Sequence, residues 1–223
     1  MSLVYEKGFG FEDQMREKGA GLIFIISAPS GTGKTTLVRE VMQQVSGLRF
    51  SVSYTTRLPR PNEREGEDYH FVSHSTFQKM IEKDEFLEWA EVLGNRYGTP
   101  RPDFKKLESE GIDLILDIDT QGAKKVVREG AQPVLIYLLP PSLKVLRERL
   151  INRGVDSLEM VKFRLSNAER DMEKVHAYHY VIINDKIGDA VEKLKSIVIA
   201  ERCRKCKNLF LEKNKKEWEE KDG

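Results

Sequence analysis

The stretch that most constrains the fold is residues 22–36, which read LIFIISAPSGTGKTT. Residues 22–27 are almost all apolar and rich in β-branched side chains, which predicts a short buried strand. A loop of small residues follows, and residues 37–45 then repeat apolar side chains at helical spacing. A strand, a glycine-rich loop ending in Lys-Thr and a helix are together typical of a phosphate-binding P-loop.

The chemistry of this loop predicts a nucleotide site. Backbone N–H groups and the helix N-terminus attract an anion, a lysine reaches the terminal phosphates, and the next hydroxyl holds Mg²⁺. The usual pattern starts with glycine where this chain has Ala28, and alanine fits there only if φ is negative. The alternative is a glycine-rich turn that binds nothing. The P-loop interpretation assigns ATP to Ala28, Pro29, Ser30, Gly31, Thr32, Gly33, Lys34, Thr35 and Thr36, with Thr35 on Mg²⁺.

Length, charge and cysteine content limit the other possibilities. A chain of 223 residues fits one domain, or one core with inserted lobes. With 37 basic and 36 acidic residues, no general field attracts nucleic acid or a membrane surface. No apolar run approaches a membrane span or a signal-peptide core, so we expect a cytoplasmic protein. Cys203 and Cys206 have no second Cys or His pair at zinc-ligand spacing, which favours two exposed thiols. The oligomeric state is left open.

The rest of the chain alternates strands and helices. Apolar runs at 112–119, 133–139 and 178–184 predict further buried strands. Strands separated by helices favour βαβ units around a parallel sheet, hence an α/β fold. Residues 50–98 interrupt this alternation with short strands, turns and one short helix, which predicts a small β-rich insertion. Residues 1–20 show no clear periodicity and receive no function. Helices are expected at 103–110, 120–129, 142–153 with Ser142 as N-cap, 157–176, and from 187 onward.

Several polar residues in and after the insertion suggest an acceptor site. Arg57 and Arg60, with Tyr69, could grip a phosphate, or the two arginines could be solvated loop charges. Glu88 interrupts an apolar strand, and the alternative is that it faces solvent on an edge strand. Asp117 and Asp119 end a buried strand, where α/β sheets place ligands and where a Walker B acid supports Mg²⁺.

Together these motifs resemble the guanylate kinase family of nucleoside monophosphate kinases. The similarity runs from about Leu22 to Arg202 and is carried by APSGTGKTTL, SVSYTTRLPRPNEREGEDYHFV, EFLEWAEVLGNRYGTP, ILDIDTQG and LRERLINRG. It implies a P-loop kinase fold and reversible phosphoryl transfer from ATP, with Mg²⁺, to GMP or dGMP. Bacterial members often accept alanine at the position of Ala28. The implied phosphate-binding residues are Arg57, Arg60, Tyr69 and Tyr97, and those around the guanine base are Ser53, Glu88, Thr99 and Asp117.

The resemblance also implies a lid. Arg149 and Arg153 lie four residues apart and so share a helix face, and Arg164 follows in the next helix. Without the P-loop, a solvated basic face would be the simpler interpretation. The family pattern makes these arginines, with Lys34 and Arg57, catalytic, and puts Asn184 on the adenine side. The implied parts are a core of 21–50, 99–141 and 166–223, a GMP-binding lobe of 51–98 and a lid of 142–165.

Two other functions remain as alternatives. One is a catalytically silent, guanylate-kinase-like module that binds phosphopeptides through the GMP lobe. The presence of Lys34, Thr35 and the lid arginines argues against it. The other is a P-loop kinase for a different small acceptor.

Overall fold

The computed structural model describes residues 21–61, 63–92, 94–154 and 157–219, with side chains described as far as Lys205. At its centre is a sheet of five parallel strands in the order β2-β7-β1-β8-β9. Ile26 pairs with Asp117 and Ser27 with Tyr137, so the carboxyl ends of the three central strands meet at one edge. The strands are β1 (Ile23–Ser27), β2 (Leu48–Phe50), β7 (Asp113–Asp117), β8 (Val134–Leu139) and β9 (Tyr180–Ile183).

Both faces of this sheet are covered by helices. Alternate residues of a strand point to opposite faces, so Phe24 and Ile26 pack with α2 (Lys34–Gln44) and α8 (Ile187–Glu219). Ile23 and Ile25 pack on the other face with α4 (Phe104–Glu110) and α5 (Thr120–Arg128). Every residue of β1 is buried, as the unbroken apolar run predicts for a parallel strand covered on both sides.

The inserted segment forms a second, smaller sheet in the order β4-β3-β6-β5. Its helix α3 (His74–Glu82) begins after Ser73, whose side chain accepts from the N–H of Thr76. Phe77 of α3 stacks on Phe86, with ring centroids 4.5 Å apart, and this contact fixes the helix on the sheet. The predicted β-rich insertion with one short helix is therefore confirmed. Its strands are β3 (Tyr54–Thr55), β4 (His70–Phe71), β5 (Phe86–Val92) and β6 (Asn95–Pro100).

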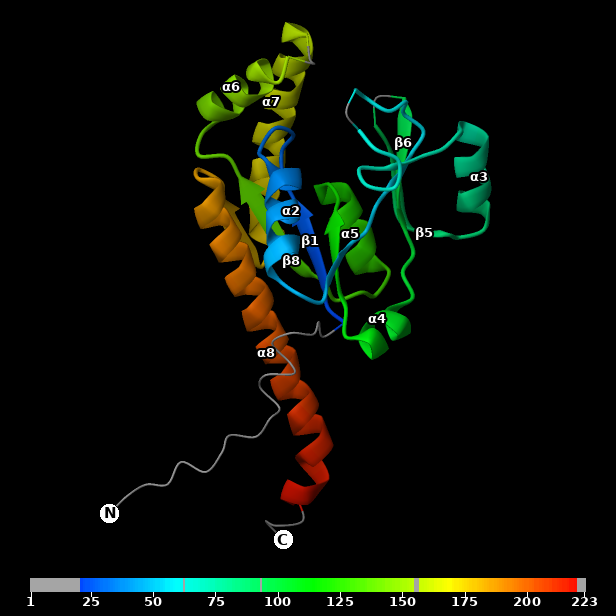
Figure 1. The fold of residues 1–223 in the computed structure, drawn as a ribbon, viewed down its shortest axis with the longest axis vertical. Helices are drawn as coiled ribbons and strands as arrows, with labels where there is room; N and C mark the ends of the chain where they lie inside the picture. Colours follow the sequence, from blue (N-terminus) through cyan, green and yellow to red (C-terminus); the bar gives the residue numbers. More distant parts are fainter. Residues whose placement is uncertain (1–20, 62, 93, 155–156, 220–223) are drawn as a thin grey trace, which may run out of the picture.

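Two helices stand over the carboxyl ends of the core strands. They are α6 (Leu143–Asn152) and α7 (Leu158–Met172), and Ser142 caps α6 as predicted by accepting from the N–H of Val145 at 3.2 Å. Figure 1 shows α6 and α7 on one side of the loop after β1 and the small sheet on the other, while α8 extends away from the opposite end. None of the helices in the described part of the chain is long and apolar enough to span a bilayer.

The expected α/β fold with a parallel sheet is confirmed, with three differences in detail. Strand β2 was not predicted, because it has three residues at a sheet edge and offers no apolar run. The helix expected over 157–176 ends at Met172 and continues as a 3-10 helix, η1 (Glu173–Ala177). The strand expected over 178–184 forms only from Tyr180 to Ile183.

Candidate active site

The loop between β1 and α2 depends on two glycines. Gly31 and Gly33 have φ of +90° and +95°, in the left-handed region that side chains avoid. A Cβ at Gly31 would lie 2.8 Å from Leu150 Cδ2, and one at Gly33 would lie 2.7 Å from Asn184 Nδ2. Asp84 is the one non-glycine residue with positive φ in the described ranges. The φ of Ala28 is therefore not positive, as an alanine at this position of the loop requires.

The start of α2 is arranged as an anion site. Gly33 is its N-cap and supplies no side-chain hydrogen bond, so no side chain caps the N–H groups of the first turn. Those N–H groups and the helix dipole favour a negative ligand. Thr32 fixes the loop, because its N–H and its hydroxyl both donate to the carbonyl of Pro29, at 3.2 and 2.7 Å. Thr35 and Thr36 are exposed in the first turn.

An ion pair joins the P-loop to the end of β7. The Lys34 ammonium contacts the Asp117 carboxylate, and both side chains are largely buried. Asp119 instead caps α5, where it accepts from the N–H groups of Gln121 and Gly122 at 2.9 and 2.8 Å. Asp117 is therefore the acidic residue in contact with the P-loop, and Asp119 has a structural partner.

The donor chemistry here suits magnesium. A hydroxyl at Thr35 and a carboxylate at Asp117 are the hard oxygen ligands that Mg²⁺ prefers, and this ion usually takes its other ligands from water and substrate phosphates. Among the described residues, no three His, Cys, Asp or Glu side chains gather as a complete metal cage. The residues present thus fit an ion held partly by a nucleotide. Of the two cysteines, Cys203 is exposed, and the side chain of Cys206 lies outside the described part of the chain.

Three of the four predicted phosphate residues come together in the small sheet and its loop. The Arg57 guanidinium lies 5.4 Å from the ring centroid of Tyr69, and the rings of Tyr69 and Tyr97 are 5.9 Å apart. Burial and the nearby Asp117 charge raise the pKa of Tyr69 to about 12, so its hydroxyl keeps its proton at neutral pH. Arg60 is half-buried in the same loop.

The predicted base residues form a buried pair on neighbouring strands. Glu88 is 8% exposed and accepts a hydrogen bond of 2.7 Å from the hydroxyl of Thr99. Burial, with the neighbouring Asp119 charge, raises the pKa of the Glu88 carboxyl above its ordinary value. The alternative in which Glu88 faces solvent is therefore wrong. Ser53, also predicted here, is half-buried, and its carbonyl accepts from the N–H of His70 at 2.9 Å.

Two of the three predicted lid arginines reach the P-loop. Arg149 donates to the carbonyls of Thr32 at 3.3 Å and Asn184 at 3.1 Å. Arg164 donates to the hydroxyl of Ser30. Asn184 is buried and also bonds the loop, since its Nδ2 donates to the carbonyl of Thr32 at 2.7 Å.

The third predicted arginine is placed differently. Arg153 is the C-cap of α6, and its side chain is exposed, so the structure does not bring it to the loop with the other two. The spacing of four residues predicts a shared helix face with Arg149, but α6 ends at Asn152 and Arg153 is its C-cap. The spacing does not predict that the helix ends there.

Sequence reasoning missed three contacts around the site. Glu63 binds the guanidinium of Arg57, and its position among arginines in a polar loop was the only signal. Gly122 lets Glu88 approach α5, because a Cβ there would lie 2.9 Å from Glu88 Oε2. Asp171, at the end of α7, accepts from Lys174 at 2.6 Å and from the hydroxyl of Thr120 at 3.4 Å, which ties α7 to α5. No sequence pattern pointed to this last contact.

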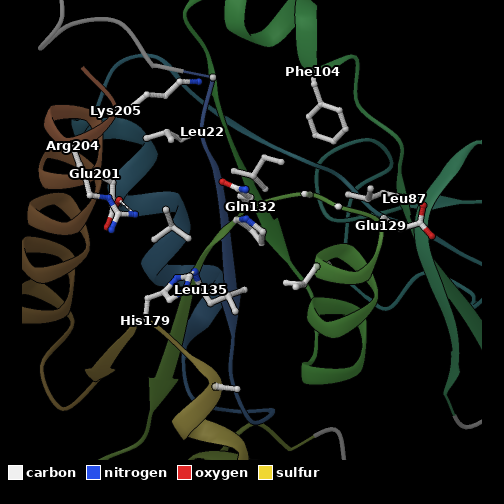
Figure 2. Close-up of a pocket in the computed structure, with 18 of the residues that line it drawn as sticks. Leu22, Leu87, Phe104, Glu129, Gln132, Leu135, His179, Glu201, Arg204 and Lys205 are labelled. Carbon is white, nitrogen blue, oxygen red and sulfur yellow. Dashed lines mark hydrogen bonds and ion pairs between the residues drawn. The ribbon is translucent and has the colours of Figure 1, made fainter. Parts of the chain in front are cut away.

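A separate pocket of about 1150 Å³ lies at the opposite end of the sheet, beside the amino ends of β1 and β8. Figure 2 shows Glu201 and Arg204 of α8 on one side of it and Phe104 and Leu87 on the other. Its charges are paired within the protein, as Arg204 with Glu201 at 2.7 Å illustrates. It does not belong to the P-loop site.

Comparisons with known proteins identify the family of this chain. The family model described as guanylate kinase matches residues 21–201. The chain is 50% identical to the guanylate kinase of Geobacter sulfurreducens, over 86% of this chain and 95% of that protein. It is 47% identical to the guanylate kinase of Desulfitobacterium hafniense, over 84% and 94%. The crystal structure of guanylate kinase from Anaplasma phagocytophilum is similar with a TM-score of 0.67 and 34% identity, over 83% of this chain and 88% of that one.

Proposed function

The chain belongs to the guanylate kinase family, and we propose that it catalyses reversible transfer of the γ-phosphoryl group from ATP to GMP, giving ADP and GDP. The observation that carries this function is the buried Glu88–Thr99 pair on neighbouring strands of the small sheet. The inserted segment is tied to the P-loop helix by an ion pair of 2.7 Å between Arg39 and Asp68.

Guanine recognition follows from the chemistry of this pair. Guanine presents its N1–H and N2–H₂ donors side by side, and a carboxylate at Glu88 can accept both. Adenine presents an acceptor at N1, which would face the carboxylate lone pairs. A site built on hydrogen bonds rejects the wrong partner strongly, because its buried polar groups are then left unpaired. We assign Thr99, Ser53 and Asp117 to the surroundings of the base, and dGMP as a second acceptor.

Phosphoryl transfer demands mainly positioning and charge neutralisation. We assign Lys34 to the β- and γ-phosphates, and Arg57 with Arg60, Tyr69 and Tyr97 to the phosphate of GMP. Arg149 and Arg164 approach the transferring group from the lid side, and Arg153 joins them when the lid closes. The acceptor is already a phosphate oxygen, so no general base is required.

Magnesium would be held by Thr35, with Asp117 contributing directly or through water. When bound, the ion supplies positive charge to the β- and γ-phosphates.

We further propose that residues 142–165 act as a lid on a core of 21–50, 99–141 and 166–223, facing a GMP lobe of 51–98. Closure of such a lid excludes water and limits ATP hydrolysis.

An acceptor panel tests the proposed reaction. ADP release is followed in a coupled assay with GMP, dGMP, AMP, CMP and UMP at equal concentrations. We expect turnover with GMP and dGMP and a rate at least about 10³-fold lower with AMP, because of the unpaired groups described above. Equal rates with all acceptors would favour a kinase of another specificity. GMP binding without turnover would favour the silent binding module.

A further inference from the structure

Glu63 lies in the loop between β3 and β4 and binds two of the residues predicted to hold the phosphate, Arg57 and Arg60. Its two oxygens accept from Arg57 Nη1 and Nη2, both at 2.9 Å. One of them also accepts from the backbone N–H of Arg60 at 2.7 Å. The side chains of Arg57 and Glu63 are only 15% and 16% exposed. A bidentate pair of this kind fixes the orientation of a guanidinium as well as its position.

The pairing leaves one edge of the guanidinium for an anion. Glu63 takes the Nη1–Nη2 edge, and Nη1 also donates to the carbonyl of Leu58 at 2.7 Å. Arg57 Nε is buried and has no hydrogen-bond partner among the described residues. The Tyr97 side chain lies against the Arg57 guanidinium and supports its charge, so Tyr97 is the protein group at this edge. A buried donor without a well-formed hydrogen bond is costly, and a ligand oxygen that accepts from Nε beside Tyr69 and Tyr97 would remove that cost. The Nε–Nη2 edge has the geometry for a bidentate phosphate contact.

The negative charge of Glu63 would oppose the binding of a phosphate beside Arg57. Burial opposes its charge, but hydrogen bonds from the Arg57 side chain and the Arg60 backbone lower the pKa of the Glu63 carboxyl below its ordinary value. A fixed negative charge therefore lies near the place where a phosphate would bind, and it repels that phosphate. Positioning has to outweigh this repulsion if Glu63 helps binding. An arginine without its partner would have several rotamers, and each hydrogen bond to the ligand would then cost side-chain entropy.

We propose that Glu63 is a positioning residue that holds Arg57 so that its Nε–Nη2 edge faces the phosphate of the acceptor nucleotide. This rests on the proposed function, because it takes GMP as the acceptor. Glu63 acts through Arg57 and does not itself contact the nucleotide.

Steady-state kinetics of Glu63→Gln test the proposal. We expect the KM for GMP to rise about tenfold to hundredfold, kcat to fall by a smaller factor, and the KM for ATP to stay unchanged, because the misplaced Arg57 guanidinium loses its contact with the phosphate of GMP and makes none with ATP. Glu63→Asp keeps the charge and should recover part of the loss. Glu67→Gln is the matched control, since Glu67 lies in the same loop and pairs with the exposed Arg64 at 3.4 Å. An unchanged or lower KM for GMP in Glu63→Gln would mean that repulsion dominates, and the proposal would be wrong.

Two further measurements separate positioning from loss of structure. Guanosine lacks the phosphate, so its inhibition constant should be the same in Glu63→Gln and the wild type, whereas equal weakening of guanosine and GMP would contradict a phosphate-specific role. In an Arg57→Ala background, Glu63→Gln should no longer weaken GMP binding, because the positioning effect of Glu63 acts only through Arg57 and only its repulsion of the phosphate is left to remove. A persistent tenfold effect there would also overturn the proposal. If the wild type itself does not phosphorylate GMP, the proposed function fails, which is a different result from any of these.

Discussion

At the scale of single residues, the proposed role of Glu88 in binding guanine uses a charge that burial makes costly. Its carboxylate is buried, and burial raises its pKa, so the folded protein binds this proton more tightly than the unfolded chain does. The favourable contribution of Glu88 to the free energy of unfolding is fully present below the pKa of an unfolded glutamate, about 4.3. It is lost as the pH rises through the raised pKa of the folded state. The ionised carboxylate, which the proposed recognition of guanine uses, is therefore the form that burial disfavours.

The matching prediction concerns Glu88→Gln. We expect the KM for GMP to rise about tenfold to hundredfold, since a hydrogen bond from guanine to a charged partner is lost, while ATP affinity measured by calorimetry stays the same. The unfolding midpoint of the unliganded variant should exceed that of the wild type at pH 7, and the difference should shrink toward pH 4. An equal loss of ATP affinity would contradict the assignment of Glu88 to the acceptor.

At the scale of elements, α5 connects the Glu88–Thr99 pair of the small sheet to the end of α7. Its first turn is capped by Asp119 and includes Gly122 against Glu88, and Thr120 at its start contacts Asp171 at the end of α7. The φ of Gly122 is not in the positive region, so its backbone does not require glycine. What the helix requires there is the absence of a Cβ.

Gly122→Ala tests this requirement. Alanine favours a helix by up to about 1 kcal/mol over glycine, so the unfolding free energy should stay level or rise. The added Cβ would push Glu88 from its place, and we expect the KM for GMP to rise about tenfold while the KM for ATP is unchanged. Urea denaturation and steady-state kinetics on the same preparation check both halves. A variant with normal GMP kinetics would show that Glu88 can shift without loss of function.

At the scale of the whole molecule, a buried ion pair holds α8 to the sheet at the end opposite to the P-loop. Asp113 and Arg202 are 0% and 4% exposed and meet at 2.7 Å. Asp113 also accepts from the N–H of Leu22, and Arg202 donates to the carbonyl of Ser46, both at 2.8 Å. These bonds join the start of β1, the start of β7, the segment after α2 and the last helix.

Breaking this pair should lower stability and spare catalysis. We expect Arg202→Met to reduce the unfolding free energy by about 3–5 kcal/mol, because it leaves the Asp113 carboxylate buried without its cation. Adding Asp113→Asn, which can still accept from Leu22, should restore part of the loss. Urea denaturation measures the unfolding free energy of the single and the double variant. In the absence of denaturant, the kcat of each folded variant should match that of the wild type. A loss of kcat without loss of stability would place Arg202 in the function instead.

The sequence by itself determined the local parts of this protein. The run from Leu22 to Thr36 specifies a strand, a loop and a helix through contacts between near neighbours, so the two glycines, Lys34 and the tolerated Ala28 could all be interpreted from the chain. The insertion and its arginines, tyrosines and Glu88 were likewise recognisable as a group. Such features depend on spacing and residue type, which a sequence displays directly.

Only the tertiary structure decided which side chains meet. The pairing of Lys34 with Asp117, the contacts of Arg149 and Arg164 with the P-loop and the exposure of Arg153 all depend on how distant segments pack. The same holds for the edge strand β2 and for the ion pair between Glu63 and Arg57. Each of these results from the relative placement of elements, which is set by burial of the core and by chain closure, and residue spacing carries no information about either.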